Sequence, residues 1–224
     1  MVRKTALLIG ASGLVGSELL KLLLNGSEYE KVIIFVRKSL ELKHPKLEEV
    51  IIEFDDLAQY KVYYDVNDVF CCLGTTIKKA RTQEAFRKID VEYPLEIARL
   101  AKEMGAEKFL VISSMGANPR SKMFYSRMKG LLEQELKQIA IGSLHIFRPS
   151  LLQGDRKEFR LGESVSAFLS KRLPFLFAGP LSRYQPIEGK TVAMGMVLAA
   201  QGEAEGVFVH ESYEIEKMKY VRIE

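Results

Sequence analysis

The chain has 224 residues, of which 47% are hydrophobic, and its formal net charge at neutral pH is +4. This length allows one sizeable core and is short for two, so we expect a single domain spanning residues 1–224. Acidic and basic residues are interspersed, which argues against a nucleic-acid-binding arm. No run approaches the roughly 18 apolar residues that span a bilayer. From the charge pattern we expect no nucleic acid as a partner, and from the short apolar runs we expect no membrane.

The two cysteines, Cys71 and Cys72, are adjacent and cannot build a disulfide framework. We therefore expect a reducing compartment and assign the protein to the cytoplasm. The basic start of the chain, followed by the apolar run 6–15, also fits a secretory signal peptide. We favour a cofactor-binding turn for this run, because its glycines are spaced as such a turn requires.

In chain order, short apolar runs alternate with helical patterns. The runs predict buried parallel strands at 6–9, 32–36, 50–54, 69–73, 109–113, 144–147 and 207–210. Helices are expected at 14–24, 82–104, 125–139 and 192–201. This alternation predicts an α/β, doubly wound parallel sheet. The loop-rich stretch of about 151–190 is expected to form, with the C-terminal segment, a small lobe on the substrate side of that sheet.

Three glycines, Gly10, Gly13 and Gly16, stand between the first strand and the first helix. Gly10 permits a tight turn, Gly13 lets the backbone approach a pyrophosphate, and Gly16 lets the helix pack close to the sheet. The free amides and the dipole of the helix would then meet the negative charge of a dinucleotide. This context predicts a Rossmann-type site whose residues in this turn are Gly10, Ser12, Gly13, Leu14, Val15 and Gly16.

The second strand ends at Arg37 and Lys38, where the residue that contacts the adenosine ribose is expected. Sites that prefer NAD usually carry a carboxylate there, which would repel a 2′-phosphate, whereas a guanidinium can grip that phosphate with two hydrogen bonds. The cofactor predicted from this pair is NADP.

A Ser-Tyr-Lys set follows the fifth strand. Ser114 lies at the end of that strand, and Tyr125 and Lys129 are four residues apart, a spacing that places both on one face of a helix. Reduction of a carbonyl by hydride requires a proton for the developing alkoxide, and a neighbouring ammonium makes a phenol a better donor. We therefore expect Ser114 to hold the substrate oxygen, Tyr125 to donate the proton and Lys129 to support Tyr125 and the nicotinamide ribose.

Taken together, these motifs resemble the atypical short-chain dehydrogenases/reductases. The resemblance rests on the glycine turn, the run 71–76, the Ser-Ser strand end, the Tyr-Lys pair and the run 147–149 with its following acidic and basic residues. It implies a Rossmann fold that binds NADPH, with Leu73, Gly74 and Thr75 beside the cofactor. Many short-chain enzymes carry Asn on the helix after strand four, whereas this chain has Asp90, which puts their Asn-supported proton relay in doubt.

The remaining polar residues are assigned to structure or surface. Adjacent thiols in an apolar strand are expected to fill the core, and the three histidines are far apart in sequence, so no metal is predicted. The basic residues after strands four and six fit solvated surface, an acidic substrate or cofactor phosphates, and Arg148 is the strongest ligand-binding candidate among them. They are Lys78, Lys79, Arg81, Arg148, Arg156 and Arg160.

Two functions follow from this pattern. One is an NADPH-dependent oxidoreductase that reduces a small-molecule carbonyl, for which the Tyr-Lys pair argues. The other is an NADP-binding regulatory protein with little turnover, which orders its loops for a partner protein when the cofactor binds. Asp90 and the small substrate lobe favour the second.

Overall fold

A parallel sheet of seven strands forms the centre of the computed structural model, which describes residues 4–154 and 185–220. Its strands are β1 (Lys4–Ile9), β2 (Tyr29–Val36), β3 (Leu47–Ile51), β4 (Asp68–Cys71), β5 (Lys108–Ile112), β6 (Ser143–Arg148) and β9 (Gly206–Glu211). They lie in the order β3-β2-β1-β4-β5-β6-β9, and every neighbouring pair is parallel. The predicted Rossmann-type doubly wound fold is confirmed.

The strand order reverses direction between β1 and β4. After β1 the chain adds β2 and β3 on one side and then returns to place β4, β5 and β6 on the other. Connections leaving the carboxyl ends of β1 and β4 therefore diverge, and doubly wound sheets bind ligands at such a point. Both the glycine turn and the run 71–76 leave the sheet at this point.

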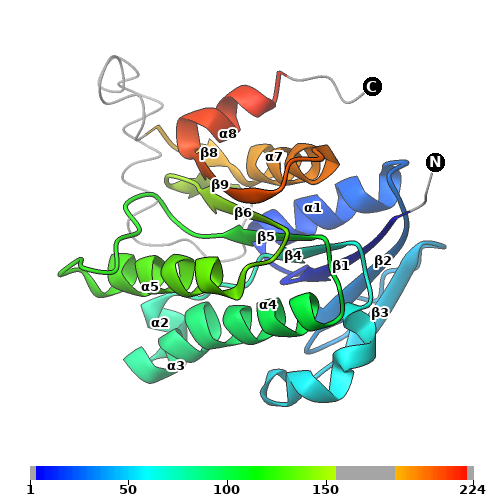
Figure 1. Cartoon of the computed structure of the whole chain (residues 1–224), viewed down its shortest axis with the longest axis horizontal. Coiled ribbons are helices and arrows are strands. Elements are labelled where there is room, and N and C mark those ends of the chain that lie inside the picture. The colour runs from blue at the N-terminus through cyan, green and yellow to red at the C-terminus, as the bar shows by residue number, and fades with distance from the viewer. Residues whose placement is uncertain (1–3, 155–184, 221–224) are drawn as a thin grey trace.

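Both faces of the sheet are covered, which explains why its strands are continuous apolar runs rather than alternating ones. Along β1, Leu7 and Ile9 belong to one buried cluster and Ala6 and Leu8 to the other. In Figure 1, α1, α7 and α8 lie on one side of the sheet, and α4 and α5 lie on the other with the short helices. The helices on the first side are α1 (Leu14–Asn25), α7 (Gly189–Gln201) and α8 (Ser212–Met218), and those on the second are α2 (Ile77–Ala80), α3 (Gln83–Arg87), α4 (Tyr93–Glu103) and α5 (Phe124–Ile139).

The helix expected at 82–104 is interrupted by a turn of π-helix, η2 (Lys88–Glu92), between α3 and α4. Pro94 lacks an N–H, so the regular bond to the carbonyl four residues earlier cannot form and the helix widens there. This wider turn carries Asp90 and Val91 into the interior, where both are buried. Sequence periodicity did not reveal the interruption, because the apolar face continues through it.

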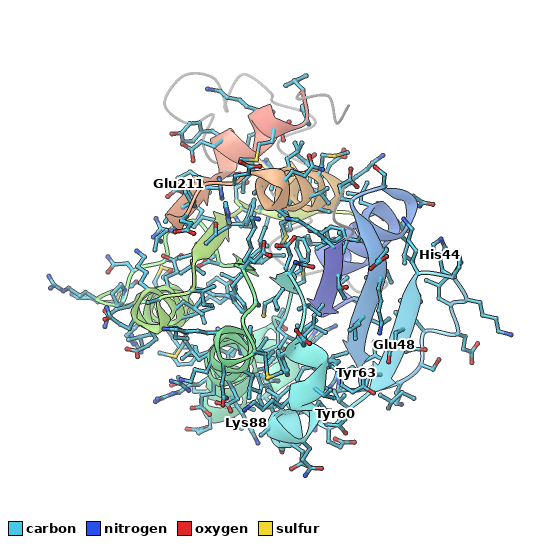
Figure 2. The ribbon with its side chains drawn as sticks, turned by 45° about the vertical axis from the view of Figure 1, so that its right-hand side comes forward. His44, Glu48, Tyr60, Tyr63, Lys88 and Glu211 are labelled. Carbon is cyan, nitrogen blue, oxygen red and sulfur yellow. The ribbon has the colours of Figure 1, made fainter. Side chains whose placement is uncertain are left out.

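Three further differences concern individual elements. The 3-10 segment η1 (Phe54–Tyr64) and helix α8 were not expected, and the third strand ends at Ile51 rather than at residue 54. Figure 2 shows Tyr60 and Tyr63 on η1, and their rings pack against Phe35 of β2 with centroids 6.0 Å away. Aromatic packing of this kind depends on tertiary contacts that no local pattern encodes.

Most of the expected substrate-side lobe lies outside the described residues. At its two ends, β7 (Leu152–Gln153) pairs in parallel with β8 (Ile187–Glu188) as a separate small sheet. At the start of the chain, Lys4–Ile9 is a central strand, so the apolar run that resembles a signal peptide is part of the core. Within the described parts of the chain, no helix has the length and apolarity needed to cross a bilayer.

Candidate active site

The glycine turn after β1 is held by steric constraints at two of its three glycines. Gly10 has φ of +88°, and a Cβ there would lie 2.6 Å from the carbonyl oxygen of Cys72. A Cβ on Gly16 would lie 2.1 Å from the carbonyl oxygen of Gly10. A Cβ on Gly13 would meet only that same oxygen, at 3.2 Å. Gly10 and Gly16 are thus required by the fold itself, whereas Gly13 is exposed and leaves its outer side free for a ligand.

Helix α1 begins directly after this turn, with Gly13 as its N-cap and no side-chain hydrogen bond to its first amides. An uncapped helix start leaves N–H groups directed outward with the positive end of the dipole, which suits a pyrophosphate. Ser12 is exposed beside it and Val15 is buried beneath it. Leu14 lies against Gly154 and Gly189, which stand near the two ends of the 151–190 stretch. The backbone of this turn therefore fits a bound dinucleotide.

Arg37 and Lys38 lie just beyond the last residue of β2, on the strand next to β1. Both are exposed, and no salt bridge or hydrogen bond to either side chain occurs among the described residues. Two unpaired cations thus stand at the edge of the sheet where the adenosine ribose of a dinucleotide is expected.

The loop after β4 is fixed by Asp90. The Thr75 amide donates a hydrogen bond of 2.7 Å to Oδ2 of Asp90, and Gly74 lies against the same side chain. Leu73 is half-buried and Gly74 is exposed. The run predicted to pass beside the cofactor is thus attached to helix element η2 behind it.

The same carboxylate reaches Lys129 of α5. Nζ of Lys129 lies 2.8 Å from Oδ1 of Asp90, and the two side chains are 4% and 1% exposed. Burial opposes the charge of Lys129, but the Asp90 carboxylate and the neighbouring Tyr125 outweigh it, so the pKa of Lys129 is raised above its ordinary value. One turn before Lys129 on the same helix, Tyr125 is half-buried, and its ring packs against Phe86 at 5.8 Å.

Ser114 follows β5 and is 8% exposed, yet its buried Oγ has no hydrogen-bond partner among residues 4–154 and 185–220. An unpaired buried hydroxyl costs free energy unless a ligand completes it. Its neighbour Ser113 is satisfied, because it donates to Glu133 of α5. The contrast singles out Ser114 as the serine that is available to a substrate oxygen.

Arg148, the strongest basic candidate for ligand binding, instead forms ion pairs with carboxylates of the protein itself. It makes two hydrogen bonds to Glu133, of 3.0 and 2.6 Å, and a third of 2.8 Å to Glu211, which is labelled in Figure 2. These carboxylates keep the pKa of Arg148 above its ordinary value. These contacts give Arg148 a structural role and argue against a ligand there, while Arg156 and Arg160 lie outside the described residues.

The two cysteines behave as expected of core residues. Cys71 is fully buried, and burial raises its pKa to about 12. The pKa of Cys72 is likewise raised well above its ordinary value by burial. Neither thiol has the thiolate character that nucleophilic chemistry needs.

Two histidines that are far apart in sequence meet in the fold. His145 of β6 and His210 of β9 stack with their ring nitrogens 3.0 Å apart, because the two strands are neighbours. Among the described residues no group of three His, Cys, Asp or Glu side chains could hold a metal. No sequence signal indicated this pair, since it depends on the order of the strands.

A groove of about 820 Å³ between η1, α4 and α5 lies away from the strand ends and contains none of the Ser-Tyr-Lys set. Each basic side chain that lines it pairs with a carboxylate of the same groove: Lys88 (Figure 2) lies 2.6 Å from Asp55, Arg87 lies 3.1 Å from Glu92, and Arg99 lies 3.6 Å from Glu96. We therefore place the candidate active site at the strand ends.

The comparisons with known proteins identify the family of the chain. A family model described as NAD(P)H-binding matches residues 10–142, which include the glycine turn, the β4 loop, Ser114, Tyr125 and Lys129. The chain belongs to this NAD(P)H-binding family. Protein HTATIP2 of Rattus norvegicus is 35% identical over 178 residues, 78% of this chain and 73% of the rat protein. The resemblance to the atypical short-chain dehydrogenases/reductases is thereby confirmed.

Other relatives extend the likeness over nearly the whole chain. Protein FMP52, mitochondrial, of Eremothecium gossypii is 30% identical over 218 residues, 94% of this chain and 95% of the fungal protein. Among solved structures, MoeE5 in complex with UDP-glucose and NAD superposes with a TM-score of 0.70 at 18% identity, over 92% of this chain and 74% of MoeE5. At that identity the likeness shows the fold alone.

The expected cytoplasmic location is wrong. Several fungal relatives are named mitochondrial proteins, which contradicts it. The physical reason is that two cysteines without a disulfide argue only against an oxidising compartment, and more than one compartment is reducing.

Proposed function

We propose that this NAD(P)H-binding protein is an NADPH-dependent oxidoreductase that reduces a carbonyl group of a small molecule. The observation that carries the proposal is the combination of a buried, unpaired Ser114 hydroxyl with a charged Lys129 one helical turn from Tyr125. When bound, NADPH would supply the hydride. Its pyrophosphate would be held by the amides at the start of α1.

The protein side of the reaction consists of three roles. Ser114 Oγ donates a hydrogen bond to the substrate oxygen and orients the carbonyl. Tyr125 gives its phenolic proton to that oxygen as negative charge develops on it. Lys129, held as an ammonium, stabilises the phenolate that remains and would hold the nicotinamide ribose.

The preference for NADPH rests on Arg37 and Lys38, two exposed cations that form no salt bridge with another described residue. The Arg37→Ser/Lys38→Asn double variant is expected to bind NADPH about tenfold or more weakly. Its affinity for NADH should change little, because only NADPH carries the 2′-phosphate. Calorimetric dissociation constants for both cofactors measure this. Equal affinities of the wild-type protein for NADPH and NADH would contradict the preference.

Catalysis is tested by NADPH oxidation with a panel of aldehydes, ketones and quinones. Tyr125→Phe is expected to lower turnover about a hundredfold or more, because the proton donor is lost while the ring remains. Tyr220→Phe, the same substitution at a tyrosine that is 77% exposed, serves as the matched control. Tight NADPH binding with no Tyr125-dependent turnover would contradict the reductase and favour the regulatory alternative.

A further inference from the structure

Asp90 is a buried carboxylate that contacts two parts of the candidate site with different oxygens. Oδ2 accepts the hydrogen bond of the Thr75 amide at 2.7 Å, and Oδ1 lies 2.8 Å from Nζ of Lys129. The side chain is 1% exposed, so water does not share these contacts. It therefore joins the loop after β4 to helix α5 through one group.

In the described part of the chain, the only carboxylate in contact with Lys129 is that of Asp90. Asp90 faces it from η2, Tyr125 from its own helix and the Cys71 thiol from β4, while the Ile112 carbonyl of β5 lies 3.5 Å from Nζ. Burial raises the pKa of Cys71 to about 12, so that thiol is neutral at physiological pH. A buried ammonium without a counter-ion tends to lose its proton.

We propose that Asp90 is the positioning residue of this site, which keeps Lys129 charged before any cofactor binds and holds the Leu73–Thr75 loop in place. A neutral amide at the same position, as many short-chain enzymes carry, could accept the Thr75 hydrogen bond but could not balance the ammonium. Where Lys129 acts in catalysis, the inference rests on the proposed function. The ion pair and the loop contact belong to the protein alone.

Asp90→Asn separates the two roles, because the amide oxygen can still accept from Thr75 while the negative charge is lost. We expect the titration midpoint of Lys129 to fall by about one to three pH units in this variant. NMR of the cofactor-free protein labelled with ¹³C,¹⁵N-lysine measures the midpoint, and Lys129→Arg assigns the signal by its loss. Asp68→Asn is the matched control. It removes another fully buried carboxylate, which faces Lys4 and Lys108 where β1, β4 and β5 begin, at the other end of the strands from the site. It should leave the Lys129 midpoint unchanged, and an unchanged midpoint in Asp90→Asn would overturn the inference.

A second measurement covers the case in which Asp90→Asn is too unstable for NMR. Removing one partner of a buried ion pair leaves the other charge unbalanced, whereas removing both does not. We therefore expect the Asp90→Asn/Lys129→Met double variant to melt at a higher temperature than Lys129→Met alone. Additive effects of the two substitutions would show that Asp90 is not the counter-ion.

The loop contact has its own readout. Hydrogen exchange of the Thr75 amide is expected to stay slow in Asp90→Asn and to become about tenfold or more faster in Asp90→Ala, which removes the acceptor. Equal exchange in all three proteins would overturn the loop role.

None of these measurements uses cofactor or substrate, so they distinguish failure of this inference from failure of the reductase proposal. If the wild-type protein does turn over, the alkaline limb of its kcat profile should move to lower pH in Asp90→Asn.

Discussion

At the scale of single residues, the three glycines of the first turn have different physical roles although their spacing is regular. Gly10 and Gly16 are fixed by backbone atoms of the protein, which a side chain would meet at 2.6 and 2.1 Å. Gly13 has ordinary backbone angles and only one tight neighbour, at 3.2 Å. Two of the glycines therefore serve the fold, and the third is the one that we propose to contact the ligand.

This difference predicts opposite outcomes for two alanine variants. Gly16→Ala is expected to destabilise the protein by about 3 kcal/mol or more, because backbone cannot move aside as a flexible side chain can. Gly13→Ala should change stability by about 1 kcal/mol or less while weakening NADPH binding about tenfold or more. Urea denaturation and calorimetry measure the two effects. Normal cofactor affinity in a folded Gly13→Ala protein would contradict the assignment.

At the scale of secondary structure, helix α5 presents Tyr125, Lys129 and Glu133 toward the sheet at four-residue intervals. Two buried ion pairs hold this face: Asp90 with Lys129, and Arg148 with Glu133. The helix that carries the proposed proton donor is thus fixed to η2 on one side and to the end of β6 on the other.

Arg148→Met is expected to lower the free energy of unfolding by about 3 kcal/mol or more, because the Glu133 carboxylate, which is 3% exposed, is left buried without a counter-ion, with only the Ser113 hydroxyl donating to it. The Arg148→Met/Glu133→Gln double variant should recover most of this loss, since no buried charge remains. Glu211→Gln is the control and should cost about 1 kcal/mol or less, because this partner is partly exposed. Urea denaturation measures these free energies, and an Arg148→Met protein as stable as wild type would show that the Arg148–Glu133 ion pair is not needed.

At the scale of the whole molecule, the neighbouring strands β6 and β9 create a pH-sensitive contact. Burial, followed by the neighbouring His210, lowers the pKa of His145 to about 4, and burial also lowers the pKa of His210. The unfolded chain therefore takes up a proton on His145 at a higher pH than the folded protein does. Stability from this residue is fully present above pH of about 6.5 and is lost as pH falls toward 4.

His145 alone is expected to reduce the free energy of unfolding by about 2 kcal/mol between pH 7 and pH 5. His145→Gln removes the titrating group, so its unfolding free energy should fall less over the same interval. The pKa of Asp68 is raised by burial, which acts in the opposite direction, but this contribution is common to both proteins and cancels in the comparison. Parallel urea titrations at the two pH values decide the matter, and identical losses would contradict the His145 contribution.

The sequence alone determined the fold class, most strand positions and the family, because these depend on local information. Apolar runs long enough for buried strands, the glycine spacing and the four-residue Tyr-Lys interval are all visible within short windows. Ser114, Tyr125 and Lys129 were also predicted from such short segments, and the structure places the last two on the inward face of α5. Composition did not determine the compartment, since free thiols fit any reducing environment.

Only the tertiary structure decided which polar groups are paired. Asp90 and Lys129 are 39 positions apart, and Arg148 and Glu211 are 63 apart, so their contacts depend on strand order and on the widened turn before Pro94. A sequence shows that Asp replaces Asn at position 90, but not that its carboxylate faces an ammonium. The free energy of a buried charge is set by its neighbours in space, and those neighbours are fixed only when the sheet is assembled.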